Sequence, residues 1–255
     1  MPDLQWNRDT WDGWYDWRSC GEEWSIPWGN SRAQWFATIL PRVGSFLPAR
    51  SVLEIGPGFG RFTGFLLPCA TSYFGVDISE KCVKACGKRF ASSTHAQFLQ
   101  NDGQSLECVA GSSFDLVFSY DTLVHAEYEV IAAYIAQIVP LLSATGVAFI
   151  HHSNLAALPE SKNTANRAQT VSAEIFEQLV RLSGGRVLLR ETIAWEQDVM
   201  SDCYTTFCRA EAYREVETLH LADVHSQKRE TASARDRFQH YLKLGAGLAP
   251  SPAER

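Results

Sequence analysis

The chain has 255 residues, of which 45% are hydrophobic, and its formal net charge is −6. This length is enough for one α/β domain with additions and a substantial buried core. The acidic balance gives no polycationic surface for nucleic acid, and no apolar run approaches the ~20 residues that span a bilayer. The first residues lack the basic start and apolar centre of a signal peptide. The seven cysteines are an odd number scattered along the chain, which favours reduced thiols over disulfides. We therefore expect a cytoplasmic protein.

An aromatic segment begins the chain, because residues 1–35 contain seven of the eight tryptophans. Such an arm either pins itself to the domain through its rings, or covers an active site as a lid. Flat amphipathic side chains can stack on a sugar or a heterocycle, so we expect Trp14 and Trp28 to contact substrate. A helix is predicted from Ser31 to Phe46, since Ser31 can cap it.

A glycine-rich loop follows the next apolar run. The segment 52–60 reads VLEIGPGFG, and residues 61–67 can begin a helix. A strand, a glycine turn and a helix form a cradle for a nucleotide-like ligand, because glycine lets the backbone approach closely. The dinucleotide fingerprint G-x-G-x-x-G/A does not fit, because Arg61 takes its third small position and Pro57 removes an N–H that a pyrophosphate could use.

The pattern Glu54-x-Gly56-x-Gly58-x-Gly60 resembles motif I of the class I S-adenosylmethionine-dependent methyltransferases. The resemblance is strong over roughly residues 50–155 and extends in pattern over 170–209. It implies S-adenosyl-L-methionine as the cofactor, with the loop under its methionine half. It also implies an α/β fold with a doubly wound, seven-stranded, mostly parallel Rossmann-like sheet and a reversed C-terminal hairpin.

Acidic residues end the next two strands. Residues 72–77 read as a strand that ends at Asp77, where a carboxylate can accept hydrogen bonds from both ribose hydroxyls. Ser79 then caps a helix to about Phe90. Residues 96–103 end in Asp102-Gly103, which by itself is typical of a plain turn. The resemblance implies that this acid binds the adenine amino group.

The cofactor site implied by the resemblance draws on the glycine loop and the first four strand ends. Residues 113–119 supply the fourth strand, an apolar run typical of the centre of a parallel sheet. The predicted cofactor-binding residues are Glu54, Gly56, Gly58, Gly60, Asp77, Ile78, Asp102, Gly103, Ser119 and Tyr120.

His125 is the candidate general base, because it follows the fourth strand at the start of a helix that runs to about residue 142. Its place resembles that of the catalytic histidine in plant small-molecule O-methyltransferases. A base that takes the hydroxyl proton contributes about 10²–10⁴-fold. Asp121, Glu127 or Glu129 could orient the imidazole. The alternative is a histidine that packs or caps the helix.

Two adjacent histidines lie in the fifth predicted strand, residues 147–154. Because strand side chains alternate, only one of His151 and His152 can point into the cleft. We place His152 with His125 and Asp121 in catalysis, and His151 in substrate contact. Asp121 and His152 could share a divalent ion, but no second acid lies convincingly beside them, so no metal is expected.

The rest of the chain reads as a loop over 156–170, a helix over 172–182, and two strands over 187–195 and 202–209. Trp195 is a further candidate for substrate contact. The tail beyond 210 has a helix-like pattern and then frays. The expected units are an arm and helix (1–48), a methyltransferase domain (49–210) and a helical extension with a flexible tail (211–255).

These features predict an enzyme that methylates a hydroxyl of a small polar molecule, similar to bacterial sugar and natural-product O-methyltransferases. N-methylation of a ring nitrogen in a heterocycle is the nearest alternative, and it needs less help from a base. Outside this class stand an NAD-dependent dehydrogenase and a non-catalytic, cofactor-binding scaffold. The expected partner is a small-molecule substrate, without nucleic acid or membrane, in a monomer or a homodimer.

Overall fold

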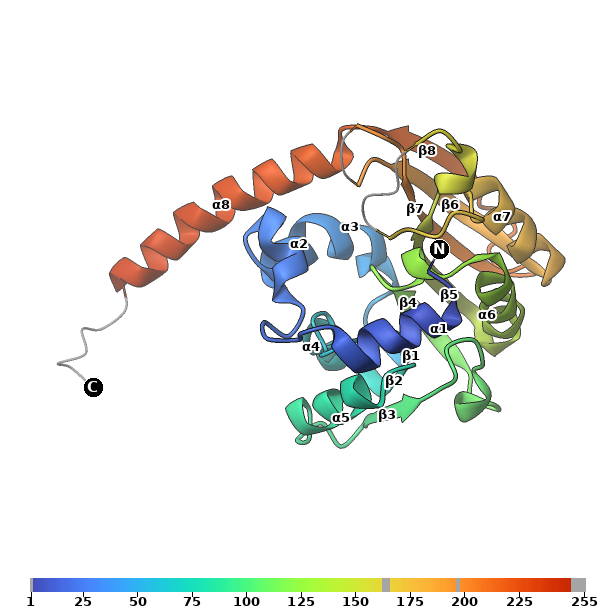
Figure 1. Cartoon of the computed structure of the whole chain (residues 1–255), viewed down its shortest axis with the longest axis horizontal. Helices are drawn as coiled ribbons and strands as arrows, with labels where there is room; N and C mark the ends of the chain where they lie inside the picture. The colour runs from blue at the N-terminus through green and yellow to red at the C-terminus, as the bar shows by residue number, and fades with distance from the viewer. Residues whose placement is uncertain (1, 162–165, 196–197, 249–255) are drawn as a thin grey trace.

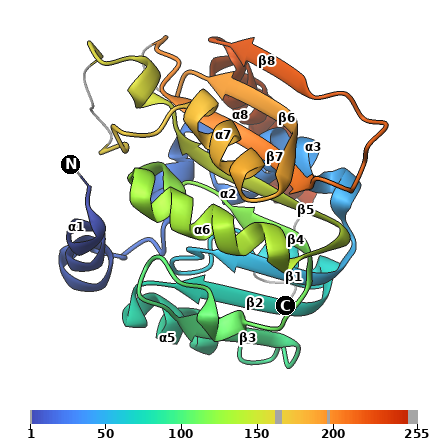
Figure 2. The same cartoon turned by 90° about the vertical axis from the view of Figure 1, so that its right-hand side faces the viewer.

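An eight-stranded sheet forms the centre of the protein (Figure 2). The computed structural model describes residues 2–161, 166–195 and 198–248. The strands lie in the order β3-β2-β1-β4-β5-β7-β6-β8. Their bounds are β1 Ala49–Ile55, β2 Ala70–Asp77, β3 Ala96–Gln100, β4 Phe114–Ser119, β5 Leu142–Ser153, β6 Gly185–Ile193, β7 Asp202–Arg209 and β8 Leu219–Asp223.

The sheet is mostly parallel, as the sequence predicts. β1 pairs in parallel with β2 and β4, and the β2–β3 and β4–β5 pairs are parallel too. β7 is antiparallel to both of its neighbours, so the reversed strand of the predicted hairpin is confirmed. In the centre, every apolar side chain of β4 is at most 1% exposed, which explains its unbroken apolar sequence.

β8 was not expected, because the tail beyond residue 210 was predicted to be helical. It pairs in parallel with β6 at the edge of the sheet. Leu219 and Leu221 remain 50% and 42% exposed, so this short strand lacks the clear burial pattern by which strands are recognised. The predicted seven-stranded order is therefore extended by one edge strand.

Helices cover both faces of the sheet, as expected for a doubly wound fold. α6 (Tyr128–Leu141) and α7 (Ala173–Leu182) pack on one face and lie in front of the sheet in Figure 2. On the other face lies the predicted helix 31–46, together with α4 (Thr63–Leu66). α5 (Glu80–Arg89) contacts β2 and β3, and Ser79 caps it as predicted by accepting a hydrogen bond from the Cys82 N–H at 3.1 Å.

The predicted helix 31–46 changes its winding along its length. It consists of α2 (Ser31–Gln34), a π-helical segment (Trp35–Ile39), α3 (Leu40–Val43) and a 3-10 turn (Gly44–Phe46). Its cap is not Ser31 but the preceding residue, Asn30, whose Oδ1 accepts a hydrogen bond from the Ala33 N–H at 2.9 Å. Both side chains are good N-caps, so the sequence alone could not separate them.

The segment 156–170 is only partly the exposed loop that was predicted. Arg167 and Ala168 are buried, and the Ala168 N–H donates to the carbonyl oxygen of Val124 at 2.8 Å. Residues 162–165 lie outside the described part of the chain. Glu160, Asn166, Gln169 and Thr170 are exposed as predicted, whereas Arg167 is buried with its charge paired to Asp121 and Asp202.

The aromatic arm and the last helix lie against each other. The arm contains α1 (Leu4–Arg8), a π-helical segment (Asp9–Trp14) and a 3-10 helix (Glu22–Trp28). α8 (Ser226–Leu248) starts beside β8 and extends away from the body in Figure 1, with Ala234 packed against Trp28. The seven cysteines carry free thiols. Within the described residues, no helix has the length and apolar character needed to cross a membrane.

Gly60 gives a first test of the glycine loop. Its φ is +82°, and a Cβ built there would lie 2.5 Å from the Phe90 ring. We expect Gly60→Ala to lower the free energy of unfolding by about 1–3 kcal/mol, because alanine is strained at positive φ and Phe90 must move. Gly13→Ala is the matched control, since its Cβ would meet nothing within 4 Å. Equal urea midpoints for the two variants would contradict this account.

Candidate active site

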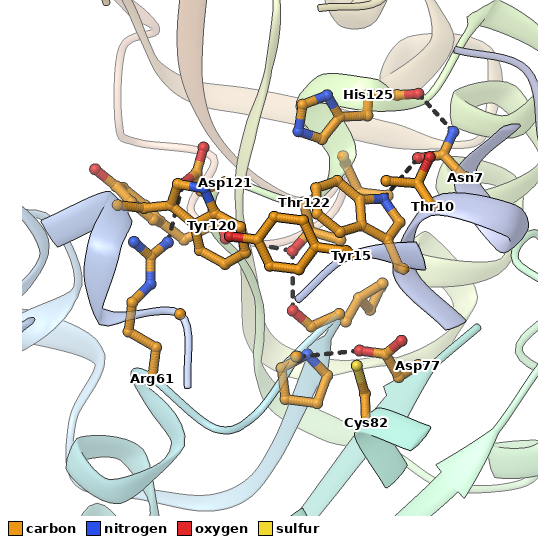
Figure 3. Close-up of a pocket in the computed structure, with 18 of the residues that line it drawn as sticks. Asn7, Thr10, Tyr15, Arg61, Asp77, Cys82, Tyr120, Asp121, Thr122 and His125 are labelled. Carbon is orange, nitrogen blue, oxygen red and sulfur yellow. Dashed lines mark hydrogen bonds and ion pairs between the residues drawn. The ribbon is translucent and has the colours of Figure 1, made fainter. Parts of the chain in front are cut away.

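A cavity of about 720 Å³ lies at the carboxyl ends of β1, β2 and β4. The glycine loop and the residues after β2 and β4 form its floor, and the aromatic arm covers it (Figure 3). In open α/β sheets, ligands bind in this position. Seven of the eight tryptophans line the cavity: Trp6, Trp11, Trp14, Trp17, Trp24, Trp28 and Trp195.

The glycines of the loop have different roles. Gly56 and Gly58 line the cavity at φ +71° and +57°. A Cβ on Gly56 would lie 2.0 Å from Thr122 Cγ2, so the loop and the segment after β4 approach as closely as glycine allows. Gly60 does not line the cavity and instead packs against Phe90.

Asp77 stands at the end of β2, where the sequence places a ribose ligand. Its carboxylate lines the cavity and accepts hydrogen bonds from the N–H groups of Gly58, at 3.0 Å, and Ser79, at 2.9 Å. Burial raises the pKa of this carboxyl group to about 6. The group is therefore mostly ionised at neutral pH and can accept hydrogen bonds from a ligand.

Glu54 differs from Asp77, although both line the cavity. The Glu54 carboxylate is buried and accepts hydrogen bonds from Tyr73 and, at 2.7 Å, from the Thr63 hydroxyl. Burial raises the pKa of Glu54 to about 7. These internal bonds tie β1 to β2 and α4, so they favour a structural role for the carboxylate.

Two of the predicted cofactor residues point elsewhere. The Asp102 side chain is exposed and accepts hydrogen bonds from the N–H groups of Gln104 and Ser105 at 3.0 and 2.7 Å. The Ser119 hydroxyl donates to the carbonyl oxygen of Ile55 at 3.0 Å. Neither residue lines the cavity, whereas Ile78, Gly103 and Tyr120 do. A turn-forming aspartate satisfies its own loop, and a buried serine satisfies its neighbouring strand.

Asp121 is the centre of a buried ion-pair network. Arg61 donates to it at 2.9 Å, and Arg167 approaches it at 3.5 Å. Arg167 also pairs with Asp202 at 3.0 Å, and Asp202 accepts a hydrogen bond from His151 Nε2 at 2.9 Å. The network closes where the Asp121 N–H donates to His151 Nδ1 at 3.2 Å.

The two arginines set the charge of Asp121. Burial alone would raise the pKa of its carboxyl group, but Arg61 and Arg167 outweigh this effect and hold the pKa below its usual range. Both arginines line the cavity, and neither was predicted as a site residue. Neither arginine carries a clear signal in the sequence. Arg61 stands where a dinucleotide motif would have a small residue, and Arg167 lies in a segment that reads as a polar loop.

His125 lines the cavity beside the arm (Figure 3). Its Nδ1 lies 2.7 Å from the carbonyl oxygen of Asn166, so Nδ1 carries the proton and Nε2 is left as an acceptor. Its ring faces Trp6 and Trp11 at centroid distances of 6.1 and 5.4 Å. Burial, with a contribution from Arg167, lowers the pKa of His125 to about 4, so the ring is neutral.

Glu127, one of the acids proposed to orient His125, binds elsewhere. The Glu127 carboxylate accepts hydrogen bonds from the N–H groups of Gln169 and Thr170, both at 3.0 Å. A backbone carbonyl therefore orients the imidazole in place of the acids proposed from the sequence.

His152 points away from the cavity, which does not fit the catalytic role proposed for it. Its ring stacks on Phe176 of α7 at 3.9 Å, and its Nε2 lies 2.8 Å from the Thr205 hydroxyl. His151 takes the other face, under Tyr120 and Trp195 at 5.0 and 4.9 Å, and these rings cover it. Across the described ranges, no three His, Cys, Asp or Glu side chains are grouped to hold a metal ion.

The substrate-contact candidates Trp14, Trp28 and Trp195 all line the cavity. Trp14 stands at the rim with 67% of its surface exposed, whereas Trp28 is fully buried and donates to the Thr38 hydroxyl at 2.8 Å. The arm is held down by Asn7, which donates to the His125 carbonyl at 3.0 Å, and by Asp12, which accepts from the Ser79 hydroxyl at 2.7 Å.

Residues 52–146 match the family model described as a methyltransferase domain. Phosphoethanolamine N-methyltransferase 1 of Zea mays is 32% identical over 117 residues, which are 44% of this chain and 23% of that protein. Phosphoethanolamine N-methyltransferase of Triticum aestivum is 30% identical over 130 residues, 49% of this chain and 26% of that protein. The chain thus spans about a quarter of the length of these relatives.

Solved structures share the fold. The N-methyltransferase NodS from Bradyrhizobium japonicum WM9, in complex with S-adenosyl-l-homocysteine, superposes with a TM-score of 0.58 at 16% identity, covering 81% of this chain and 96% of NodS. An S-adenosylmethionine-dependent methyltransferase from Clostridium acetobutylicum ATCC 824 gives 0.57 at 13% identity, covering 71% and 92%. The predicted likeness to sugar and natural-product O-methyltransferases is not confirmed by these matches.

Proposed function

We propose, from the premise that this chain carries a class I S-adenosylmethionine-dependent methyltransferase domain, that it methylates a nitrogen of a small amine. One observation carries the proposal. A single cavity runs from the glycine loop and Asp77 to a chamber walled by tryptophan rings and His125. Cofactor and acceptor can therefore meet in one enclosed space, as in-line transfer requires.

The residues of the floor fit the cofactor. Gly56 and Gly58 bring the backbone to the cavity without side chains, and Asp77 offers an ionised carboxylate for a ribose. Ile78 and Gly103 lie together beside this acid, with a Cβ on Gly103 only 2.5 Å from Ile78, and they offer an apolar surface to a flat ring. When bound, the cofactor supplies an electrophilic sulfonium methyl group.

The weak basicity of His125 favours nitrogen over oxygen as the acceptor atom. A base works best when its pKa lies near the working pH, and the pKa of His125 is about 4. A hydroxyl must lose its proton as the bond forms, whereas an ammonium group can give its proton to water before transfer, and the resulting amine then attacks with its lone pair. The indole rings also attract methylated cations through their faces. The curated relatives described above are N-methyltransferases by name.

Hydroxyl methylation stays the second candidate, because His125 lines the cavity with Nε2 as an acceptor. A labelling experiment distinguishes methylation of nitrogen from methylation of a hydroxyl. The protein is given methyl-labelled S-adenosylmethionine with a pool of small amines that includes phosphoethanolamine, and separately with a pool of sugars and alcohols. We expect label in the amine pool. Label only in the alcohols would overturn the choice of nitrogen, and no label in either pool would overturn the function.

His125→Gln is expected to lower kcat on an amine by less than about tenfold, since the histidine only lines and orients there. A general base would instead contribute about 10²–10⁴-fold. His220→Gln serves as the control, because that side chain does not line the cavity. Steady-state rates at saturating cofactor, with melting curves to check folding, decide the question. A loss of a hundredfold or more would make His125 the base and favour the hydroxyl.

A further inference from the structure

Two buried side-chain polar atoms lack a hydrogen-bond partner within the described residues: Glu23 Oε2 and Thr10 Oγ1. Both belong to the aromatic arm, and both residues line the cavity. Leaving such an atom unpaired costs about 1–3 kcal/mol, and more when the group is charged, so native proteins rarely leave one without a purpose. The unpaired oxygen of the Glu23 carboxylate therefore costs more free energy than that of Thr10.

The neighbours of Glu23 define what could pair with it. The Tyr15 hydroxyl donates to Oε1, and burial, together with this bond, raises the pKa of Tyr15 well above its usual range. The phenol thus keeps its proton, and the carboxylate has one oxygen held and one open. The Tyr15 ring stacks on Trp24 at 5.1 Å and meets the edge of Trp17 at 5.0 Å.

An open carboxylate oxygen among aromatic faces calls for a positively charged N–H donor. A charged donor gives a stronger hydrogen bond to a carboxylate than a neutral one, and aromatic faces attract cations. A ligand carboxylate or phosphate would be repelled at this point. We propose that Glu23, whose carboxylate is held by Tyr15, forms a subsite that binds an organic ammonium group, an inference that rests on the proposed function. Tyr15 stacks on Trp24 and the Arg61 guanidinium lies 5.3 Å from the centre of that ring, so the open carboxylate oxygen supplies the attraction.

Two ligands could bring this group: the α-ammonium of the cofactor, or the positively charged nitrogen that methyl transfer leaves on the acceptor. The test measures the affinity of S-adenosylhomocysteine by calorimetry, and that of trimethylammonium chloride by NMR titration in the presence of saturating S-adenosylhomocysteine. For Glu23→Gln we expect one of the two affinities to fall about tenfold or more, because a charge-assisted bond is lost. The affinity that falls identifies the source. Unchanged values for both ligands would overturn the proposal.

Glu22→Gln is the matched control. It removes the same charge from the adjacent position, but Glu22 accepts from the Ser31 N–H at 3.0 Å and does not line the cavity. Its ligand affinities should equal those of the wild type. If Glu22→Gln weakens binding as much as Glu23→Gln, a general charge effect explains both, and the subsite is refuted.

Two further measurements do not depend on turnover, so they separate failure of this inference from failure of the proposed function. Without S-adenosylhomocysteine, the wild type should bind trimethylammonium at least tenfold more tightly than the neutral analogue tert-butanol, and equal affinities under this condition would refute the subsite. The unliganded melting temperature of Glu23→Gln should not fall, because an unpaired charge has been removed. A lower melting temperature with unchanged ligand affinities would make Glu23 a structural residue only.

Discussion

Replacing Asp77 by asparagine is expected to weaken S-adenosylhomocysteine binding by about 10²–10⁴-fold. In the proposed function, its carboxylate accepts hydrogen bonds from both ribose hydroxyls, and bonds to a charged group contribute about 1.5–3 kcal/mol each. Asparagine keeps the shape but turns one acceptor into a donor that faces the N–H of Gly58 or Ser79. Calorimetric titration measures the loss, and circular dichroism checks the fold.

The pH dependence of the wild type tests the same group. Because the pKa of Asp77 is about 6, its carboxylate gains a proton as the pH falls below that value. We expect the affinity for S-adenosylhomocysteine to decline between pH 7 and 5, and the asparagine variant to lack this decline. Glu80→Gln, on the exposed side of α5, should bind as the wild type does. Wild-type affinity in Asp77→Asn would remove this residue from the proposed site.

Asp202→Asn is expected to lower the free energy of unfolding by about 3–5 kcal/mol, the usual cost of breaking a buried ion pair on one side. Asp202 is fully buried and holds Arg167 at 3.0 Å and His151 at 2.9 Å. Without it, Arg167 loses its 3.0 Å ion pair, and its contact with Asp121 is longer, at 3.5 Å. Urea denaturation at pH 7 measures the difference.

The sign of the pH effect follows from the same network. Burial would raise the pKa of Asp202, but Arg167 and His151 outweigh it and hold the pKa far below the usual value. Its stabilising contribution is therefore present above the unfolded pKa of about 3.9 and is lost as the pH falls towards the folded value. The difference in the free energy of unfolding between the wild type and Asp202→Asn should therefore become smaller below about pH 4.

Asp16→Asn is the control for Asp202→Asn. Asp16 pairs with Arg18 at the surface, where an ion pair contributes at most about 1 kcal/mol. If the free energy of unfolding of Asp202→Asn also lies within about 1 kcal/mol of the wild-type value, the network does not stabilise the fold.

The central strands could be predicted from the sequence because their burial on both faces demands long apolar runs. β4 is the clearest example, while β1 and β2 are buried mainly towards their carboxyl ends, and the carboxyl ends of the three strands meet by topology. β8 could not be predicted, since an exposed edge strand needs no such run. The winding of residues 31–46 could not be predicted either, since this segment packs against the sheet through Trp35, Ile39 and Val43.

In the site, chain topology predicts which strand ends meet but not which side chains pair. Asp77, Asp121 and His125 could be placed because each follows a parallel strand. Arg61 and Arg167 could not, because their partners lie far away in the sequence. His151 and His152 could not be told apart either. Both faces of β5 are buried at that end, so alternation gives the two directions without saying which one faces the cavity side, and neither histidine lines the cavity itself.

The gathering of indoles gives the protein an optical property. Trp35 is the only tryptophan that does not line the cavity, and the others stand within about one ring width of an aromatic neighbour, as Trp11 does 5.9 Å from Trp24. Excitation can pass between such close rings, so most of the emission should come from the indoles that line the cavity. Near-ultraviolet fluorescence should therefore change when a ligand enters, and the chain would report its own occupancy without an added dye.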